Sequence, residues 1–287
     1  MALLSLRDIK RRIRSVQNTQ QITRAMEMVA AAKLKRAQSR VVAARPYAAK
    51  MEQMLRSLSA AAASLDHPLF EKRPVRRTAL VIVTADRGLA GSYNTNVLRE
   101  ADRILKSRPR EELRVVTVGR KGLVYVTRRG WKPVLSYTDM GDVPDAVRIR
   151  RMTDEITALF VSQEVDEVVL LFTRFISTMT RRVVTEKFLP IEGSAAETES
   201  PAREYIFEPS PEAIFGALLP RYAVTRFMAA LAEALASEHS SRMVAMGSAT
   251  RNADEMIDLL IIRRNRARQA AITKEIAELV GGAEALK

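Results

Sequence analysis

A glycine-bearing turn follows an apolar, strand-like segment in the stretch VIVTADRGLAGSYNTNVL, residues 81–98. An apolar run that leads into a glycine turn and then a helical pattern is typical of phosphate-binding loops. A dinucleotide loop needs the spacing G-x-G-x-x-G, but Gly88 and Gly91 are three residues apart. A Walker loop needs a lysine directly after its last glycine, and here Ser92 and Tyr93 follow Gly91. The stretch has the shape of a nucleotide site and lacks the groups that bind one.

Asp86 is the candidate for chemistry in this turn, as a Mg²⁺ ligand or a general base at the carboxyl end of a strand. No second carboxylate, histidine or nucleophile elbow accompanies it in the stretch. We therefore expect Asp86 to cap the turn, and Ser92 or Asn94 to cap the helix that follows. The segment Gly119-Arg120-Lys121-Gly122 is interpreted in the same way, as a strand end and a turn.

Few other residues could support catalysis or metal binding. The chain has no cysteine, which excludes disulfide frameworks, cysteine-containing zinc sites and thiol catalysis. The two histidines, His67 and His239, stand alone in the sequence, and we expect both to be surface or packing residues. The sequence therefore predicts no catalytic residue, no cofactor and no metal site.

The net charge of +14 is concentrated at the amino terminus. Residues 1–64 carry thirteen lysines and arginines against three acidic residues, whereas the rest of the chain is nearly balanced. A basic segment of this kind favours nucleic acid, an anionic membrane or an acidic protein as partner. The sequence contains no run of 18 to 20 consecutive apolar residues of the kind that spans a bilayer.

The amino-terminal segment predicts one long helix with a coiled-coil seam. Between Leu6 and Ala62 the chain contains one proline, Pro46, and no glycine. Most residues in two series spaced by seven positions are apolar or small, as a coiled coil requires. The two series are Ile9, Val16, Thr23, Ala30, Ala37, Ala44, Met51, Leu58 and Leu6, Ile13, Gln20, Glu27, Leu34, Val41, Ala48, Leu55, Ala62. Because the seam turns polar near Thr23, we expect the packing face to rotate there onto Ile22, Met26 and Val29.

The carboxy-terminal segment predicts the partner helix. From Pro220 to Val280 the chain contains one glycine, Gly247, and no further proline. Apolar residues recur along it with a looser period: Val224, Phe227, Leu231, Leu235, Met243, Met246, Met256, Leu260, Ile272, Ile276 and Leu279. The polar run RRNRARQ, residues 263–269, interrupts this pattern, and charge pattern alone favours a solvated face there.

The middle of the chain, residues 75–190, alternates strand and helix patterns, which predicts a mostly parallel sheet with helices on its faces. Residues 192–203 are rich in serine, glutamate and alanine and are interpreted as a loop. The fold class is therefore α/β: a long antiparallel coiled coil of terminal helices plus a Rossmann-like, mostly parallel sheet domain. We predict boundaries at 1–64 for the first helix, 65–210 for the α/β domain and 211–287 for the last helix.

Two functions other than catalysis fit the pattern of the basic helix about equally well. A nucleic-acid-binding coiled coil would use its cations, although no aromatic residue for base stacking precedes Tyr47 and no known module is recognisable. A rod inside an acidic protein channel would use the same cations. A nucleotide-dependent enzyme that uses the turn at Gly88 and Gly91 is the third alternative.

Four segments resemble one known family, the gamma subunits of F-type ATP synthases. RRIRSVQNTQQITRAMEMVAAAKLKRA at 11–37 closely resembles the amino-terminal helix of that family. ITKEIAELVGGAEA at 272–285 matches its carboxy-terminal signature, and TADRGLAGSYN at 84–94 and ASEHSSRMVAMGSATRNADEMI at 236–257 are similar to family segments. The resemblance extends over essentially the whole chain.

This resemblance implies a non-catalytic rotor shaft. In the family, the terminal helices enter a ring of alternating alpha and beta subunits, and proton flow turns the c-ring together with gamma. Arg268 and Gln269 match residues that meet a polar loop of one beta subunit, and Met26 matches a position sensitive to coupling. Three apolar residues match the bearing tip: Ile272, Ile276 and Leu279.

The resemblance also implies partners and a location. The expected partners are the alpha and beta subunits, the epsilon subunit and the c-ring, with one copy of this chain per complex, no nucleic acid and no cofactor. The cysteine-bearing regulatory insertion of chloroplast members is missing, so thiol regulation is not expected. Because the family helix begins almost at Met1, we expect no transit peptide and a position on the cytoplasmic face of a bacterial plasma membrane.

Overall fold

The computed structural model describes residues 5–57, 67–141, 145–191 and 211–284. The chain packs as two compact units. Residues 1–30 and 243–287 form the first, here called the helix-pair unit, and residues 31–242 form the second, the sheet unit. Two long helices contribute to both units: α1, Leu6–Ser57, and α6, Pro211–Glu284.

The sheet unit contains one five-stranded sheet in the order β3-β2-β1-β4-β5. Four of its strands are parallel: β1 (Thr78–Val83), β2 (Leu113–Val118), β3 (Leu135–Tyr137) and β4 (Glu167–Phe175). The last strand, β5 (Arg181–Leu189), pairs antiparallel with β4. The α/β fold with a mostly parallel sheet is therefore confirmed.

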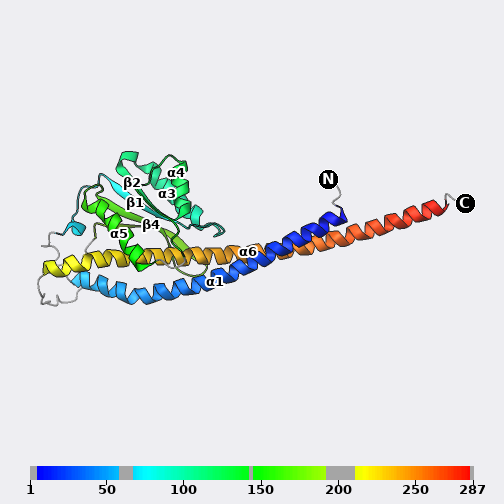
Figure 1. Cartoon of the computed structure of the whole chain (residues 1–287), viewed down its shortest axis with the longest axis horizontal. Coiled ribbons are helices and arrows are strands. Elements are labelled where there is room, and N and C mark those ends of the chain that lie inside the picture. Colours follow the sequence, from blue (N-terminus) through cyan, green and yellow to red (C-terminus); the bar gives the residue numbers. More distant parts are fainter. Residues whose placement is uncertain (1–4, 58–66, 142–144, 192–210, 285–287) are drawn as a thin grey trace. The chain divides into compact units, whose positions relative to one another are not determined.

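Both faces of the sheet are covered by helices (Figure 1). Helices α3 (Tyr93–Ser107) and α4 (Arg120–Arg128) cover one face, where Leu80 and Ile82 of β1 point into a small core. Helix α5 (Ala146–Val161) and the first part of α6 cover the other face, over Val81 and Val83. β1 is buried along its whole length, as expected for a central parallel strand. Two short 3₁₀ helices, Pro68–Phe70 and Arg110–Glu112, precede β1 and β2.

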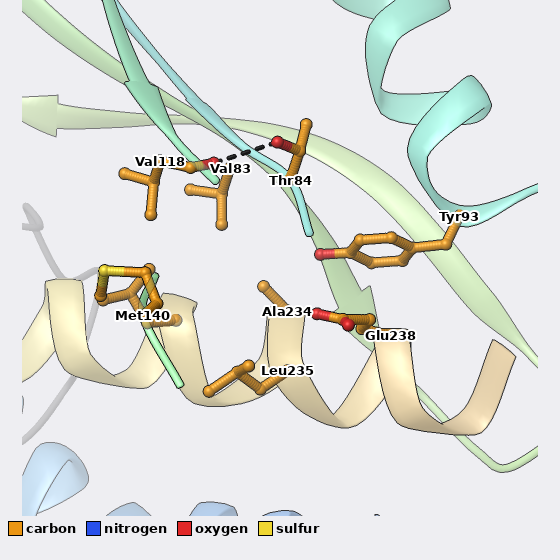
Figure 2. Close-up of a pocket in the computed structure, with 9 residues that line it drawn as sticks. Val83, Thr84, Tyr93, Val118, Met140, Ala234, Leu235 and Glu238 are labelled. Atoms are coloured by element: carbon orange, nitrogen blue, oxygen red, sulfur yellow. Dashed lines mark hydrogen bonds between the residues drawn. The ribbon is translucent and has the colours of Figure 1, made fainter. Parts of the chain in front are cut away.

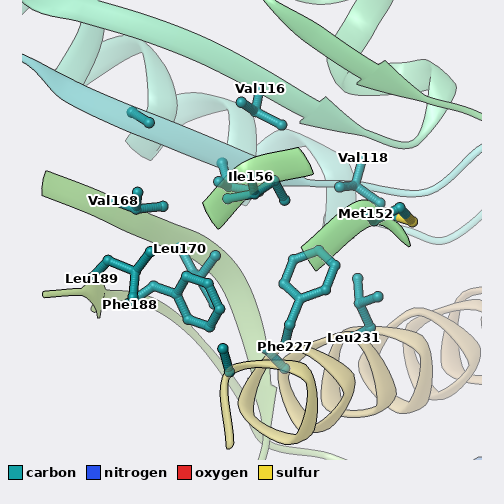
Figure 3. Close-up of a cluster of buried hydrophobic side chains, with 14 of the residues drawn as sticks. Val116, Val118, Met152, Ile156, Val168, Leu170, Phe188, Leu189, Phe227 and Leu231 are labelled. Atoms are coloured by element: carbon teal, nitrogen blue, oxygen red, sulfur yellow. The ribbon is translucent and has the colours of Figure 1, made fainter. Parts of the chain in front are cut away.

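The larger core joins α6 to the sheet (Figure 3). Phe227 and Leu231 project from α6 toward Phe188 of β5 and the side chains of α5. The rings of Phe188 and Phe227 lie 6.1 Å apart between centroids, within the range of favourable aromatic contact. This half of α6 is therefore a core element of the sheet unit and not a free coiled-coil strand.

The seam predicted for α1 is confirmed by burial. Every α1 side chain that the structure describes as buried belongs to one of the two seven-residue series: Ile9, Ile13, Thr23, Ala30, Leu34, Ala37, Val41 and Met51. The expected rotation of the packing face is wrong. Thr23 stays in the seam at 9% exposure, while Ile22 and Val29 are more than half exposed.

α6 begins at Pro211, where the last helix was predicted to begin, and continues through Pro220, which lies inside it. One expectation for α6 needs correction. Met256 is exposed, not part of the packed face. The loop expected at 192–203 and the last turn expected for α1 lie outside the described residues.

By composition, α6 also contains an 18-residue window of mean hydropathy 1.2 within Ala213–Gly281, which is long and apolar enough to cross a membrane. A buried core helix passes the same test, and 39% of this window is buried inside the protein. The window by itself does not identify a membrane span.

Replacing Phe227 with alanine tests the role of α6 in the core. The side chain is fully buried, so Phe227→Ala should lower the free energy of unfolding by about 3–5 kcal/mol in urea denaturation. Met179→Ala, at a site 73% exposed, is the control and should change it by less than about 1 kcal/mol. Equal effects of the two substitutions would contradict the packing described.

Candidate functional site

The loops at the carboxyl ends of β1 and β2 cross each other closely. The Thr84 amide donates to the Val118 carbonyl at 2.8 Å, and the Thr84 hydroxyl accepts from the Gly122 amide at 2.8 Å. Gly119 has φ +94°, and a Cβ there would lie 2.1 Å from the Thr84 carbonyl oxygen. Only glycine fits this crossing, because both the positive φ and the backbone contact exclude a side chain. The strand end predicted just before residue 119 is confirmed, but the predicted turn is wrong: Gly119 is the N-cap of α4, and Arg120–Gly122 already belong to that helix.

Asp86 has a role other than the one expected. Its Oδ1 accepts from the Arg120 amide and its Oδ2 from the Met140 amide, each at 2.9 Å. The carboxylate therefore joins the loops after β1, β2 and β3 and does not cap its own turn. Ser92 takes the N-cap position of α3 without a capping hydrogen bond, and the Asn94 side chain accepts from the Ala85 amide at 3.0 Å.

The place where a nucleotide would bind in a doubly wound sheet is filled by the chain itself (Figure 2). A cavity lies there, with about 20 Å³ of free volume. Its lining residues come from β1, β2, two following loops, the start of α3 and α6: Val83, Thr84, Tyr93, Val118, Met140, Leu231, Ala234, Leu235 and Glu238. This volume accommodates about one water molecule, so the cavity cannot hold a nucleotide.

A buried ion pair on α6 holds the opening stretch in place. Arg242 donates to Glu238 at 2.6 Å, and both side chains are nearly buried. Arg242 also donates to the Gly88 carbonyl at 3.3 Å. Burial, and then the nearby Glu238 carboxylate, raise the pKa of Tyr93 well above its usual range. The stretch 84–94 is thus a contact between the sheet and α6.

The histidines serve packing and capping, as expected. His239 is buried beside Arg242. The Nδ1 atom of His67 accepts from the Leu69 amide at 3.2 Å and caps the first 3₁₀ helix, and burial lowers the pKa of His67. Within the described residues, no group of three or more histidine or acidic side chains could hold a metal ion.

The helix-pair unit consists of the start of α1 and the end of α6, which run antiparallel (Figure 1). The Thr250 hydroxyl donates to the Thr23 hydroxyl at 2.9 Å, and Gln20 donates to Asp254. Farther along, Ile13 shares an apolar cluster with Leu260. In this register, the start of α1 is level with about residue 267 of α6.

Polar pairs replace apolar ones in the middle of this seam. The pairs Thr23–Thr250 and Gln20–Asp254 follow one another along it. A Cβ on Gly247 would lie 2.8 Å from the Glu27 carboxylate, so the missing side chain makes room for that group. Polar seam residues of this kind cost stability but specify the register of a coiled coil.

The register brings two basic runs to the same level. Five cations come from α1 and four from α6: Arg7, Lys10, Arg11, Arg12, Arg14, Arg263, Arg264, Arg266 and Arg268. We call these nine residues the basic girdle. Asp8, bound to Arg11 at 3.0 Å, is the acidic residue within residues 6–14 and 263–269. The nine cations occupy different positions of the helical repeat. They therefore lie on both sides and on the outer faces of the helix pair, and the girdle surrounds the pair.

The predicted contact residues fall into two groups. Arg268 and Gln269 are neighbouring exposed residues at the edge of the girdle. Met26 is half-buried near the level of residue 247, about 20 residues or roughly 30 Å away along the pair. The structure therefore does not bring Met26 together with Arg268 and Gln269.

The predicted tip lies beyond the described start of α1 (Figure 1). All described side chains from residue 268 to residue 281 are exposed. Ile272, Ile276 and Leu279, which are 48% to 74% exposed, share one face because they are four and three residues apart. A single helix with an exposed apolar face is only marginally stable in water. It needs an apolar surface to pack against.

The arginines and the lysine that α1 contributes to the girdle were not among the sequence-based candidates. The sequence shows how many cations the start of α1 carries. Whether they lie level with the run at 263–268 depends on the register of the two helices. Only an alignment of the two helices through Thr23 and Thr250 shows that the basic run of α1 and the polar run of α6 lie at the same level.

An Asp86→Asn substitution tests the joint between the three loops. An amide nitrogen cannot accept, so one of the two backbone N–H groups loses its partner and stability should fall by about 1–3 kcal/mol. Hydrogen exchange should accelerate at whichever of the Arg120 and Met140 amides faces the new NH₂ group. Asp154→Asn, whose exposed carboxylate lies 4.0 Å from Arg150, is the control. Unchanged protection of both amides would refute the joint.

Known proteins match this chain over nearly its full length. Residues 5–286 match the ATP synthase family. The chain is 49% identical to the ATP synthase gamma chain of Moorella thermoacetica, covering 98% of this chain and 99% of that one. It is 48% identical to the gamma chain of Desulforamulus reducens, covering 99% and 100%.

Solved structures share the fold. The central stalk of the Tetrahymena thermophila mitochondrial ATP synthase is 25% identical, with a TM-score of 0.63 over 79% of this chain and 99% of that chain. The rotor of the Euglena gracilis enzyme is 18% identical, with a TM-score of 0.66 over 93% and 98%, and supports the fold alone. Because nearly half of its residues are identical to those of gamma chains over almost the full length, the protein belongs to the ATP synthase gamma-chain family.

Proposed function

We propose that this chain is the central rotor shaft of an F-type ATP synthase, which couples proton flow through the membrane sector to ATP synthesis or hydrolysis in the beta subunits. The observation that carries the proposal is the 49% identity to a gamma chain over nearly the full length of both proteins. Residues 1–64 and 211–287 would provide the two shaft helices, and residues 65–210 the stalk domain, whose core also includes the first part of α6. The chain itself would have no catalytic role, and the chemistry would occur in its neighbours.

Coupling through a shaft requires differential contact. A shaft changes a distant site only if it binds one conformation of that site better than another. Each tenfold change in nucleotide affinity requires about 1.4 kcal/mol of such difference. Arg268 and Gln269 are exposed at the edge of the basic girdle and would donate charge-assisted and neutral hydrogen bonds, respectively, to a polar beta loop. Met26 would act at a second level of the shaft.

The girdle and the tip of the helix-pair unit suit different surroundings. The basic girdle fits acidic segments of the surrounding ring. The tip residues Ile272, Ile276 and Leu279 would turn in an apolar collar, where weak and non-directional contacts do not resist rotation.

The proposed partners are the alpha and beta subunits, the epsilon subunit and the c-ring, with one copy of this chain per complex. The protein would lie on the cytoplasmic face of a bacterial plasma membrane. The c-ring and epsilon contacts are expected near residues 192–205, which lie outside the described residues.

Co-purification tests this proposal directly. The chain, tagged in its own host, should co-purify with alpha and beta subunits at one copy per ring. The isolated chain should neither bind nor hydrolyse ATP. Stoichiometric ATP binding would favour an enzyme instead, and duplex binding that survives physiological salt would favour a nucleic-acid-binding protein.

Arg268→Ala and Gln269→Ala test the proposed contact with beta. Each should lower the rate of ATP synthesis by up to about tenfold, because a charge-assisted or neutral hydrogen bond to beta is lost. The amount of assembled complex should stay the same. Arg251→Ala is the control, since this exposed cation of the same helix binds only Ser248 among the described contacts. Unchanged synthesis in both variants would remove the contact.

A further inference from the structure

The four parallel strands of the sheet begin at one edge, which we call the amino edge. Helices α3 and α4 each connect two of these strands and therefore end near the same edge. Exposed cations gather in the segments that meet there: Arg76, Arg108, Arg110, Arg128 and Lys132. They belong to the sheet unit and have no part in the basic girdle.

Direct contacts join the segments that precede β1, β2 and β3. Arg108 follows α3 and donates to the Thr78 hydroxyl, at the start of β1, at 2.7 Å. Arg110, just before β2, donates to the Arg129 carbonyl at 3.0 Å, and its guanidinium lies 4.9 Å from the centroid of the Trp131 ring. Each of the five cations makes one of these contacts or lies within two residues of one, so they share one surface.

Most carboxylates of the amino edge already have partners. Asp102 binds two other cations, at 2.6 Å and 3.1 Å. Asp166, just before β4, accepts from two backbone amides that precede β1. Among the described contacts, none of the five cations binds a carboxylate, while Glu111 and Glu112 are the carboxylates beside them that bind no cation. The surface therefore keeps an excess of positive charge.

The position of these cations at helix ends is a partial explanation only. A cation near the carboxyl end of a helix interacts favourably with the helix dipole. Arg128, in the last turn of α4, and Arg108, the C-cap of α3, fit that role. Arg76 and Lys132 lie outside the helices, and Arg110 opens a 3₁₀ helix, so their charges need another reason.

Apolar groups are exposed among the cations. Trp131, the only tryptophan of the chain, is half-buried under Arg110. Val75 and Val134, which precede β1 and β3, are 48% and 40% exposed. Tryptophan is enriched where a protein meets the membrane–water interface, and clustered cations are attracted to anionic lipid headgroups.

We propose that the five cations and Trp131, here called the basic edge, bind the anionic phosphate headgroups of a lipid surface. The inference rests on the proposed function, which places the chain beside a membrane. The arginine forks match phosphate oxygens in a bidentate way. An acidic protein segment would satisfy the same cations, but the exposed tryptophan and valines between them would gain nothing from it. A lipid interface accommodates both kinds of group.

The fluorescence of Trp131 tests the proposal, because a single tryptophan reports on this edge and on no other part of the chain. The full-length chain is mixed with vesicles of phosphatidylglycerol and phosphatidylcholine. The emission should shift to shorter wavelength, and iodide should quench it less. Vesicles of phosphatidylcholine alone should cause no shift, and raising the salt from about 0.1 M to about 0.5 M should abolish it, since salt screens exposed charges.

Matched double substitutions locate the binding surface. Arg128→Gln with Lys132→Gln should raise the lipid concentration at half-maximal binding about thirtyfold, which corresponds to about 2 kcal/mol for the two cations. Arg150→Gln with Arg182→Gln removes two exposed cations near the opposite edge of the sheet and should change it less than about threefold. Binding is followed by vesicle sedimentation together with the fluorescence shift.

Four results would overturn the proposal. They are sedimentation with vesicles without a change at Trp131, which assigns the binding to another surface such as the basic girdle; equal weakening by both double variants; the same shift on neutral vesicles; and the same shift with polyglutamate at equal negative charge, which would favour an acidic protein. Failure of the chain to co-purify with alpha and beta subunits would remove the rotor function and leave these measurements unchanged, so the two failures are distinguishable.

Two further variants keep the test valid if the double variant does not fold. Arg128→Lys with Lys132→Arg keeps both charges and should bind vesicles like the unchanged chain. The single change Lys132→Gln should require about fivefold more lipid, and an unchanged requirement would contradict the proposal.

Discussion

The antiparallel register of α1 and α6 is the constraint on which the surfaces of the helix-pair unit depend. The Thr23–Thr250 and Gln20–Asp254 hydrogen bonds tie polar seam positions together. A slip by one heptad would separate these partners and leave polar groups facing apolar ones, which is costly in a packed seam. The same slip would move the two basic runs off a common level. The seam thus gives up some apolar burial and gains a unique alignment of the basic girdle.

The sheet unit shows how a fold that often binds nucleotides can serve another purpose. Its carboxyl edge has the strand–turn–helix form of a ligand site, but α6 lies there, and its Arg242 reaches the Gly88 carbonyl. The Asp86 carboxylate, which could have bound a metal, is used by two backbone amides. Fold and function are separate properties, and here the edge that usually holds a ligand holds a helix of the same chain.

The periodic features of this chain could be predicted from its sequence, and the long-range contacts could not. Alternation of apolar runs gave the strands, and the seven-residue repeat gave the buried face of α1, because both patterns are local. Asp86 was misjudged, since its partners lie 34 and 54 residues away in the sequence. The face rotation expected at Ile22 was wrong because Thr23 finds a hydroxyl partner on α6, which no local pattern reveals. The girdle likewise requires the pairing of residues more than 200 positions apart.

The nine cations of the girdle also repel one another. Several lie within a Debye length, about 10 Å at 0.1 M salt, so this repulsion weakens the end of the helix pair when it is free. Added salt screens the repulsion and tightens the unbound pair, yet the same salt weakens attraction to an acidic channel. Higher ionic strength would therefore stabilise the free helix pair and weaken its binding to an acidic channel. An acidic ring would supply the missing counter-charge, so the end of the shaft would be firmest when it is inserted.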